Sequence, residues 1–406
     1  MTEDELYRAS TQYRLWSFTP RALASLRAGT HALAAEKVAA ARTSKRDDVS
    51  RPSREGNGVD SNGAEGGRDA SGRVAKAADD GEVECLTLAE AQQLVDFYCS
   101  KAIELCNHLK WPATVKATAL QYLRRFYLSA SPLTYPPSTI IKPTIFLANK
   151  TENHNLSLDE YAVKAKATRD QILAPEFIVS QGLRFTFDVR HPLRGLPGAY
   201  MELMSLADGT AEVLAGVGKT AKELQQELMA LPDGTGPANG APAAEKAADV
   251  LSLKRRIHTA YIAANKTLET TALLTDVYFL YTPSQIMFAA LLLADTPLTT
   301  FYLTTKIPSA SPPPSKIRAA IESCAQILRA APDIVSQAEA SRLKAKLERC
   351  RDQDKLDLVG LNRALKRDGR EEGVVTESVA KRRKLEREMS AREGEELFGP
   401  EIGRQA

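Results

Sequence analysis

Two apolar segments of this chain repeat one pattern, and that repetition constrains the fold more than any other feature. Residues 137–148 read PSTIIKPTIFLA and residues 283–294 read PSQIMFAALLLA, which align without a gap as P-S-x-I-apolar-x6-A. The second segment is too short to cross a bilayer, because Asp276 and Asp295 bracket it and a span needs about 20 apolar residues. We expect each segment to be a helix buried among other helices.

Helix signals surround the first segment. Thr87 and Glu90 are spaced as a capping box, and the helix they open carries apolar residues at three- and four-residue steps. A second helix is expected after Pro112, a fourth after Ser157 and a fifth from Thr168. With no convincing strand pattern, these helices form a five-helix unit around residues 137–148.

The second half of the chain repeats this order. A short helix is expected near residues 200–206 and a long one at about 249–278, and Thr282 and Gln285 then form a capping box ahead of the second apolar segment. The repeat is roughly a hundred residues long, which exceeds the 20–50 residues of solenoid repeats. The predicted fold is all-α, with two tandem five-helix repeats and additional N- and C-terminal helices.

Composition divides the chain further. Two segments, at 43–82 and 232–248, are rich in Gly, Ala, Asp and other residues that bury little apolar area, and we expect both to be disordered insertions. The expected division is an N-terminal helical arm at 1–42, the insertion at 43–82, a first repeat at 83–194, a second repeat at 195–335 with a partly disordered insertion around 207–248, and a C-terminal helix and charged tail at 336–406.

Several classes of function are disfavoured. The net charge of +3 over 406 residues gives no global field for nucleic acid or anionic lipid. The opening residues lack a secretory signal, and the five cysteines contain no C-x-x-C, so reduced thiols in cytosol or nucleus are expected. No metal site and no cofactor are predicted. Gly218-Lys219-Thr220 is not a phosphate loop, because Val213 stands where that motif needs glycine.

Five segments carry a resemblance to a known family. They are RLWSFTPRALASLRA (14–28), ATALQYLRRFYL (117–128), IFLANKTENHNLS (145–157), LTDVYFLYTPSQI (274–286) and LKAKLERC (343–350). Together with the duplicated bundle, they resemble the cyclin family, and the five-helix units would be its cyclin-box repeats.

The resemblance implies a nuclear, non-catalytic regulatory subunit of a protein kinase. The expected partners are a cyclin-dependent kinase of the CDK-activating kinase, a RING-containing assembly subunit and, through them, the TFIIH core. The complex would phosphorylate the RNA polymerase II C-terminal domain and the activation loops of other kinases. Direct nucleic-acid or membrane binding is not expected.

The resemblance also implies kinase-binding residues. Lys150, at the end of the third helix, and Glu176, in the fifth, match positions that hold the αC helix of the kinase by its main chain. Leu147, Phe185 and Phe187 match positions that give apolar contacts. From spacing alone, Lys150 and Glu176 would be a surface ion pair worth at most about 1 kcal/mol, and the three apolar residues could equally close the core of the first repeat.

Two prolines depart from the family pattern. Pro143 and Pro175 lie inside the third and fifth helices, where each removes a backbone donor, and we expect a kink or restart there. Such a change could tilt the binding residues away from the family geometry.

The C-terminal segment carries two further signals. A C-terminal helix is expected to pack beside the repeats, on an apolar stripe formed by Leu343, Leu347, Cys350, Leu358, Leu361 and Leu365. Residues 381–384 (KRRK) resemble a nuclear import signal, although a solvated charged tail fits them equally.

Two alternative functions remain open. One is another transcriptional cyclin with a different kinase, and the other is a TFIIB-like DNA-binding factor, which would need basic stripes and a zinc ribbon.

Overall fold

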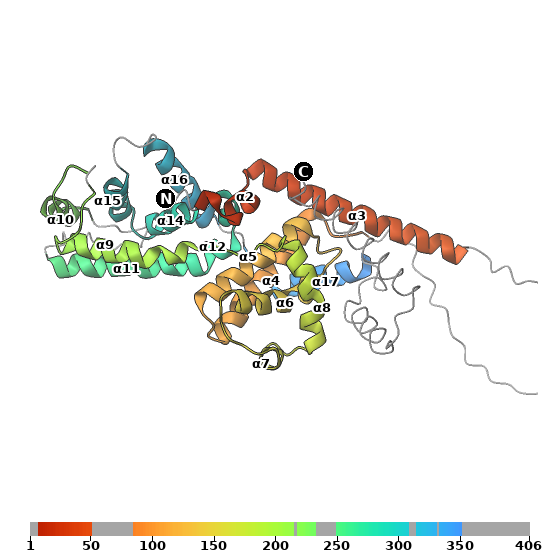
Figure 1. Cartoon of the computed structure of the whole chain (residues 1–406). Helices are drawn as coiled ribbons and strands as arrows, with labels where there is room; N and C mark the ends of the chain where they lie inside the picture. Colours follow the sequence, from red (N-terminus) through yellow and green to blue (C-terminus); the bar gives the residue numbers. More distant parts are fainter. Residues whose placement is uncertain are drawn as a thin grey trace, which may run out of the picture.

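The protein consists of helices arranged as two lobes, with three terminal helices laid against them (Figure 1). This computed structural model describes residues 7–50, 84–214, 217–232, 249–307, 314–330 and 333–350, and these ranges contain no strand. The first lobe holds α4 (Leu88–His108), α5 (Ala113–Ser129), α6 (Pro137–Thr151), α7 (Leu158–Lys164) and α8 (Arg169–Gly182). The second holds α9 (Leu196–Ala207), α11 (Val250–Glu269), α14 (Pro283–Ala294), α15 (Thr296–Lys306) and α16 (Pro314–Arg329).

The two apolar segments are the central helices of the two lobes, as predicted. Helix α6 packs against α4, α5 and α8, and α14 packs against α11, α15 and α16. Each lobe therefore has five main helices in the same order around a buried third helix, which confirms the all-α duplicated fold. No helix in the described ranges is both long enough and apolar enough to span a membrane.

The predicted helix starts are confirmed by their hydrogen bonds. At the start of α4, the Glu90 amide donates to the Thr87 hydroxyl at 3.2 Å, and the Thr87 amide donates to the Glu90 carboxylate at 2.8 Å. Thr282 and Gln285 make the same reciprocal pair at α14. Each box satisfies backbone donors that the first turn of a helix leaves unpaired.

The two internal prolines do not end their helices. Helix α6 runs through Pro143 and α8 runs through Pro175, so the expected restart is wrong. Both rings are buried. We attribute the continuity to the packing of α6 against α8, which places both rings in the core and offsets the missing backbone hydrogen bond.

The predicted long helix at 249–278 is interrupted. Helix α11 ends at Glu269, because Thr270 leaves the helical region (φ −125°, ψ −81°). Two single-turn helices follow, α12 (Thr271–Leu274) and α13 (Val277–Leu280), and Asp276 lies between them. The interruption turns the Asp276 carboxylate toward the first lobe.

Helix α10 (Ala221–Met229) lies in the segment that we expected to be a partly disordered insertion. Its buried residues Leu224 and Leu228 join the main core. Thr220, from the rejected phosphate-loop match, forms the N-cap of this helix together with Glu223. Residues 233–248 of the insertion lie outside the described residues.

The N-terminal arm is formed by α2 (Thr11–Trp16) and α3 (Pro20–Ser50), and α3 extends beyond the first lobe (Figure 1). Helix α3 therefore continues past residue 42, which corrects the expected start of the first insertion, and residues 51–83 lie outside the described range. Trp16 and Leu23 of the arm are buried against Leu128 of the first lobe and Phe279 of the second. The arm thus bridges the two lobes.

The C-terminal helix is α17 (Gln337–Cys350), and it packs on α4. Leu343, Leu347 and Cys350 are all buried there, as the stripe predicted. Leu358, Leu361, Leu365 and residues 381–384 lie outside the described residues.

Candidate functional site

Lys150 and Glu176 meet at the edge where α6 ends beside the middle of α8. The Lys150 ammonium and the Glu176 carboxylate form an ion pair. The Lys150 ammonium also lies 4.8 Å from the centre of the Phe146 ring, a distance at which a cation is attracted to an aromatic face. Lys150 is in the last turn of α6, where the helix dipole favours a cation. The two predicted polar residues therefore come together at the protein surface.

The three predicted apolar residues have different environments. Leu147 is only 6% exposed and belongs to the core of the first lobe. Phe187 is half-buried, with its ring 6.1 Å from that of Tyr122, and its carbonyl accepts a 2.6 Å hydrogen bond from the Tyr122 hydroxyl. Phe185 alone is open to solvent, at 58% exposed. Of the three, Phe185 is the most accessible to a partner.

Two further apolar residues extend this surface and were missed from the sequence. Leu173 and Phe177 lie one turn apart on α8 and are 36% and 60% exposed. The Phe177 and Phe185 rings are 6.2 Å apart between centroids. The signal was present in residues 172–179 (ILAPEFIV), which hold more apolar residues than one buried face can take. We call Lys150, Leu173, Glu176, Phe177 and Phe185 the α8 surface.

A glycine sets the position of α8. A Cβ placed on Gly182 would lie 2.5 Å from the Phe126 ring of α5, so only glycine allows this approach. The Ser129 hydroxyl donates to the Gly182 carbonyl at 3.1 Å. The end of α8 is therefore fixed against α5, and this contact also fixes the position of the α8 surface.

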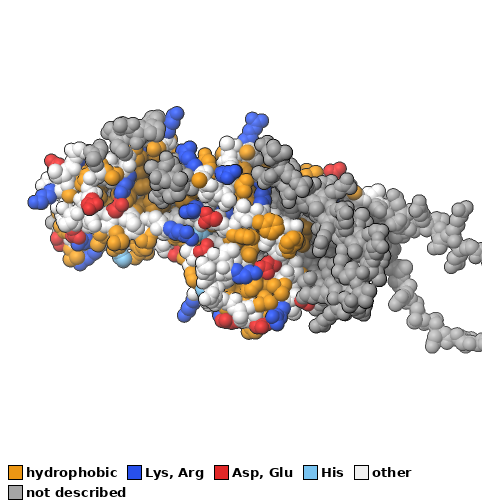
Figure 2. Space-filling model, viewed as in Figure 1, with side chains coloured by type: hydrophobic (Ala, Val, Ile, Leu, Met, Phe, Trp, Pro, Cys, Tyr) orange, Lys and Arg blue, Asp and Glu red, His pale blue; other side chains and the backbone are white. Residues whose placement is uncertain are grey.

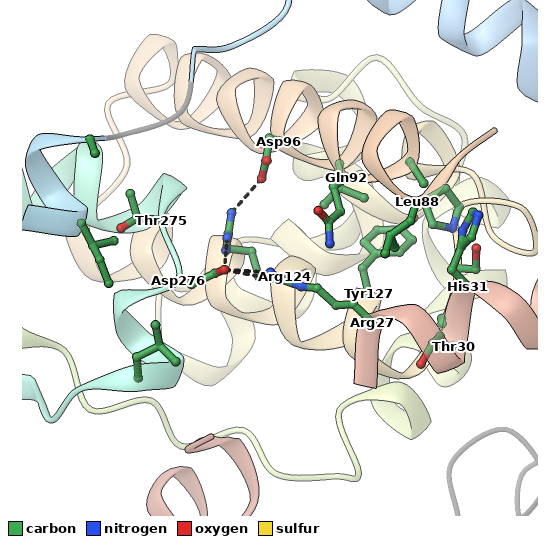
Figure 3. A pocket seen from close by; sticks show the side chains of 18 residues that line it. Arg27, Thr30, His31, Leu88, Gln92, Asp96, Arg124, Tyr127, Thr275 and Asp276 are labelled. Atoms are coloured by element: carbon green, nitrogen blue, oxygen red, sulfur yellow. Dashed lines mark hydrogen bonds and ion pairs between the residues drawn. The ribbon is translucent and has the colours of Figure 1, made fainter. Parts of the chain in front are cut away.

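A chain of four charged residues joins the arm to both lobes (Figure 3). Arg27 of α3 makes a bidentate contact with Asp276 at 2.6 and 2.7 Å. Arg124 of α5, only 7% exposed, donates to Asp276 at 2.6 Å and to Asp96 of α4 at 2.8 Å. These residues form part of the wall of a cavity of about 280 Å³ between α3, α4, α5, α13 and α16.

Arg27 and Arg124 stabilise the ionised form of Asp276. Burial alone would raise the pKa of the Asp276 carboxyl, but Arg27 and Arg124 outweigh burial and hold that pKa well below its usual range. For Asp96, burial dominates and raises the pKa despite the contact with Arg124. The arm, the first lobe and the second lobe are thus coupled through Asp276.

A buried histidine also joins the lobes. His191, just before the 3-10 helix η1 (Pro192–Arg194), lies 2.7 Å from the Thr118 hydroxyl and 3.2 Å from the Tyr278 hydroxyl. Burial, with Arg194 and Arg125 nearby, lowers the pKa of His191 to about 3. The ring is therefore neutral near pH 7 and serves as a structural hydrogen-bonding partner.

Charged and apolar side chains alternate over the visible face of both lobes (Figure 2). Within the described ranges, no cluster of three or more His, Cys, Asp or Glu side chains is arranged to hold a metal ion. The α8 surface offers two paired charges and a group of exposed apolar side chains, which is the composition of a protein-binding site.

Comparison with known proteins indicates which proteins this chain is similar to. The cyclin C-terminal domain family matches residues 191–329. Cyclin CCL1 of Saccharomyces cerevisiae is 32% identical over 309 residues, which cover 76% of this chain and 63% of the yeast protein. A putative cyclin-H of Dictyostelium discoideum is 31% identical over 30% of this chain and 43% of its own length. The chain thus spans less than two thirds of these curated relatives.

Solved structures agree. A chain of the CAK complex of Chaetomium thermophilum bound to ATP-gamma-S has a TM-score of 0.65 at 29% identity, covering 93% of this chain and 99% of that one. A chain of the yeast TFIIK (Kin28/Ccl1/Tfb3) complex has a TM-score of 0.52 at 28% identity, covering 79% of this chain and all of that one. This chain has the all-α cyclin-box fold. Cyclin CCL1 matches over most of this chain, whereas the putative cyclin-H of Dictyostelium discoideum matches over 30% of it.

Proposed function

We propose that this chain is the regulatory cyclin of a CDK-activating kinase, the kinase module of TFIIH. Similarity to cyclins supports a non-catalytic regulatory subunit. The proposed partners are a cyclin-dependent kinase, a RING-containing assembly subunit and, through the complex, the TFIIH core, with the nucleus as the site of action. The supported activity is phosphorylation of the RNA polymerase II C-terminal domain and of CDK activation loops.

The observation that carries the proposal is the α8 surface, on a chain similar to components of CAK and TFIIK complexes. Lys150 can donate to backbone carbonyls of a partner helix and Glu176 can accept from its backbone N–H groups. Each has a partner in the free protein, so neither charge is left unpaired before binding. We further propose residues 83–194 and 195–335 as the two cyclin-box repeats.

Some of the apolar residues would contact the kinase directly, and others would support those residues from the core. Phe185, with Phe177 and Leu173, would insert into the kinase interface, where a few buried aromatic anchors supply most of the affinity. Leu147 and Phe187 would support this surface from beneath, since they are already packed in the lobe.

Activation would be a population shift in the kinase. A cyclin-dependent kinase alone favours an inactive arrangement of its αC helix, and the cyclin binds the active arrangement better. Moving such an equilibrium from 1:99 to 99:1 takes about 5.5 kcal/mol of differential affinity. A standard-sized interface with several anchors supplies that amount, and this chain then needs no reacting group of its own.

The test is co-expression of this chain with the candidate kinase and RING subunit, comparing wild type with the Lys150→Ala, Glu176→Ala double variant. We expect the double variant to recover less complex and less kinase activity while the isolated cyclin stays folded. The matched control is Lys101→Ala with Glu104→Ala, an exposed ion pair on α4. Undiminished binding by the first variant would exclude these contacts, and recovery of a different kinase would favour another transcriptional cyclin.

A further inference from the structure

Two cysteines from distant parts of the sequence meet where the C-terminal helix packs on the first lobe. Cys85 lies just before α4, and Cys350 is the last residue of α17. Both side chains pack in the same small apolar cluster, and Cys85 lies near enough to Cys350 to raise the pKa of that thiol. Cys350 is 1% exposed, whereas Cys85 is half-buried and reachable from solvent.

Packing on both sides holds the two thiols in place. Cys350 shares a small apolar cluster with Leu86, Leu343 and Leu347, and Cys85 packs against the same cluster. One turn earlier in α17, the Lys346 ammonium pairs with the Glu84 carboxylate at 3.0 Å and with the Glu90 carboxylate at 2.9 Å. The packing of the two cysteines is therefore part of the docking of α17 on α4.

The remaining cysteines differ in their surroundings. Cys99, Cys106 and Cys324 are all buried in the main core of the two lobes. Burial raises the pKa of each of these thiols to about 12, which disfavours the reactive thiolate. We therefore expect these three cysteines to stay unmodified under conditions in which Cys85 and Cys350 react.

We propose that Cys85 and Cys350 are a thiol modification site that forms a reversible intramolecular disulfide on exposure to a glutathione disulfide. Both cysteines lie at one packing contact, so the two sulfurs have a short approach to make to the bonded distance of about 2.05 Å. The bond would join the start of α4 to the end of α17, so the redox state would control how firmly the C-terminal helix is held.

The reaction proceeds in two exchanges. The Cys85 thiolate attacks one sulfur of glutathione disulfide, its S–S bond breaks, and one glutathione thiolate leaves. The Cys350 thiolate then attacks the Cys85 sulfur and displaces the second glutathione thiolate. Two protein thiols are oxidised, one glutathione disulfide is reduced to two glutathiones, and the two protons lost by the cysteines are taken up by the leaving thiolates.

Cys85, whose thiol is half-buried, is the residue that attacks glutathione disulfide first. Burial and the neighbouring Cys85 raise the pKa of Cys350 to about 11, so little Cys350 thiolate is present near pH 7. The second exchange is therefore the slow one, and its rate is expected to rise with pH.

The experiment treats the full chain with glutathione disulfide, alkylates the remaining thiols and maps every cysteine by mass spectrometry. We expect free thiols, titrated after denaturation, to fall from five to three, with a peptide pair linked through Cys85 and Cys350. A reductant should restore all five, and the oxidised protein should unfold at a higher denaturant concentration than the reduced one.

Two variants keep the test decisive. Cys350→Ser should stop at a stable glutathione adduct on Cys85, and Cys324→Ser should behave as wild type with one thiol fewer throughout. The proposal is overturned if wild-type Cys85 retains glutathione while Cys350 stays free, if both thiols remain reduced, or if the linkage forms between two chains.

Discussion

Replacing Asp276 with Ala is predicted to destabilise the protein more than replacing its partner Arg27 with Met. The two changes leave different charges behind. Arg27→Met leaves the Asp276 carboxylate paired with Arg124 at 2.6 Å. Asp276→Ala leaves Arg124, which is only 7% exposed, with Asp96 as its remaining carboxylate, and it also removes the acceptor of Arg27.

The exposure of each side chain indicates how much unfolding free energy each change should cost. Arg27→Met removes one bidentate, charge-assisted contact whose side chains are 19% and 28% exposed, and it should cost about 2 kcal/mol of unfolding free energy. Asp276→Ala breaks a network at its most buried cation, for which about 3 to 5 kcal/mol is expected. The double variant should cost less than the sum, because both changes remove the same contact.

Urea unfolding of the full chain, followed by circular dichroism, measures the three differences. The matched control is Lys101→Met, which removes an exposed ion pair with Glu104 and should change stability by less than about 0.5 kcal/mol. The reasoning fails if Arg27→Met costs as much as Asp276→Ala, or if both fall within the range of the control. The first result would mean that Arg124 does not depend on Asp276 as argued, and the second would mean that the ion pairs do not couple the arm to the lobes.

Three further predictions follow from single contacts. Gly182→Ala should cost about 2 kcal/mol of unfolding free energy, seen in denaturant melts, since the added methyl overlaps Phe126; no loss would mean that α8 moves freely. Burial lowers the pKa of His191 from 6.5 to about 3, so the unfolded state binds the proton first as the pH falls. The free energy of unfolding should therefore decrease below pH 6.5, by about 2 kcal/mol at pH 5. His191→Gln should flatten this pH dependence in melts. Phe177→Ala should weaken kinase binding by about 2 kcal/mol in calorimetry, whereas Val163→Ala, on exposed α7, should change it little; equal effects would remove Phe177 from the interface.

Local signals in the sequence were enough to predict the architecture. The capping residues Thr87 and Thr282 act on their own first turn, and their partners stand three residues away. The burial of α6 and α14 follows from composition, because segments with so few polar residues have no stable exposed face. The duplicated all-α fold could therefore be predicted from spacing and hydrophobic pattern, and the resemblance then indicated the family.

Features that depend on distant residues could not be predicted in this way. Helix α11 ends before Thr270 although no proline or glycine marks the position, and α12, which follows, packs on α4 and α5 of the first lobe. The burial of Leu147 and the exposure of Phe177 depend on which face of each helix meets its neighbours. A kink or restart was expected at Pro143 and Pro175 from propensity alone, yet both helices continue through these positions.

The most direct test of the central claim is a rate measurement with purified components. The assay follows phosphorylation of a peptide from the RNA polymerase II C-terminal repeat by the candidate kinase alone, by this chain alone, and by the two together with the RING subunit held constant. We predict no phosphorylation by this chain alone and a saturable rise in the kinase's rate as the chain is added, with Lys150→Ala, Glu176→Ala giving a smaller rise. A folded wild-type chain that leaves the rate unchanged, or that phosphorylates the peptide by itself, would contradict the proposed function.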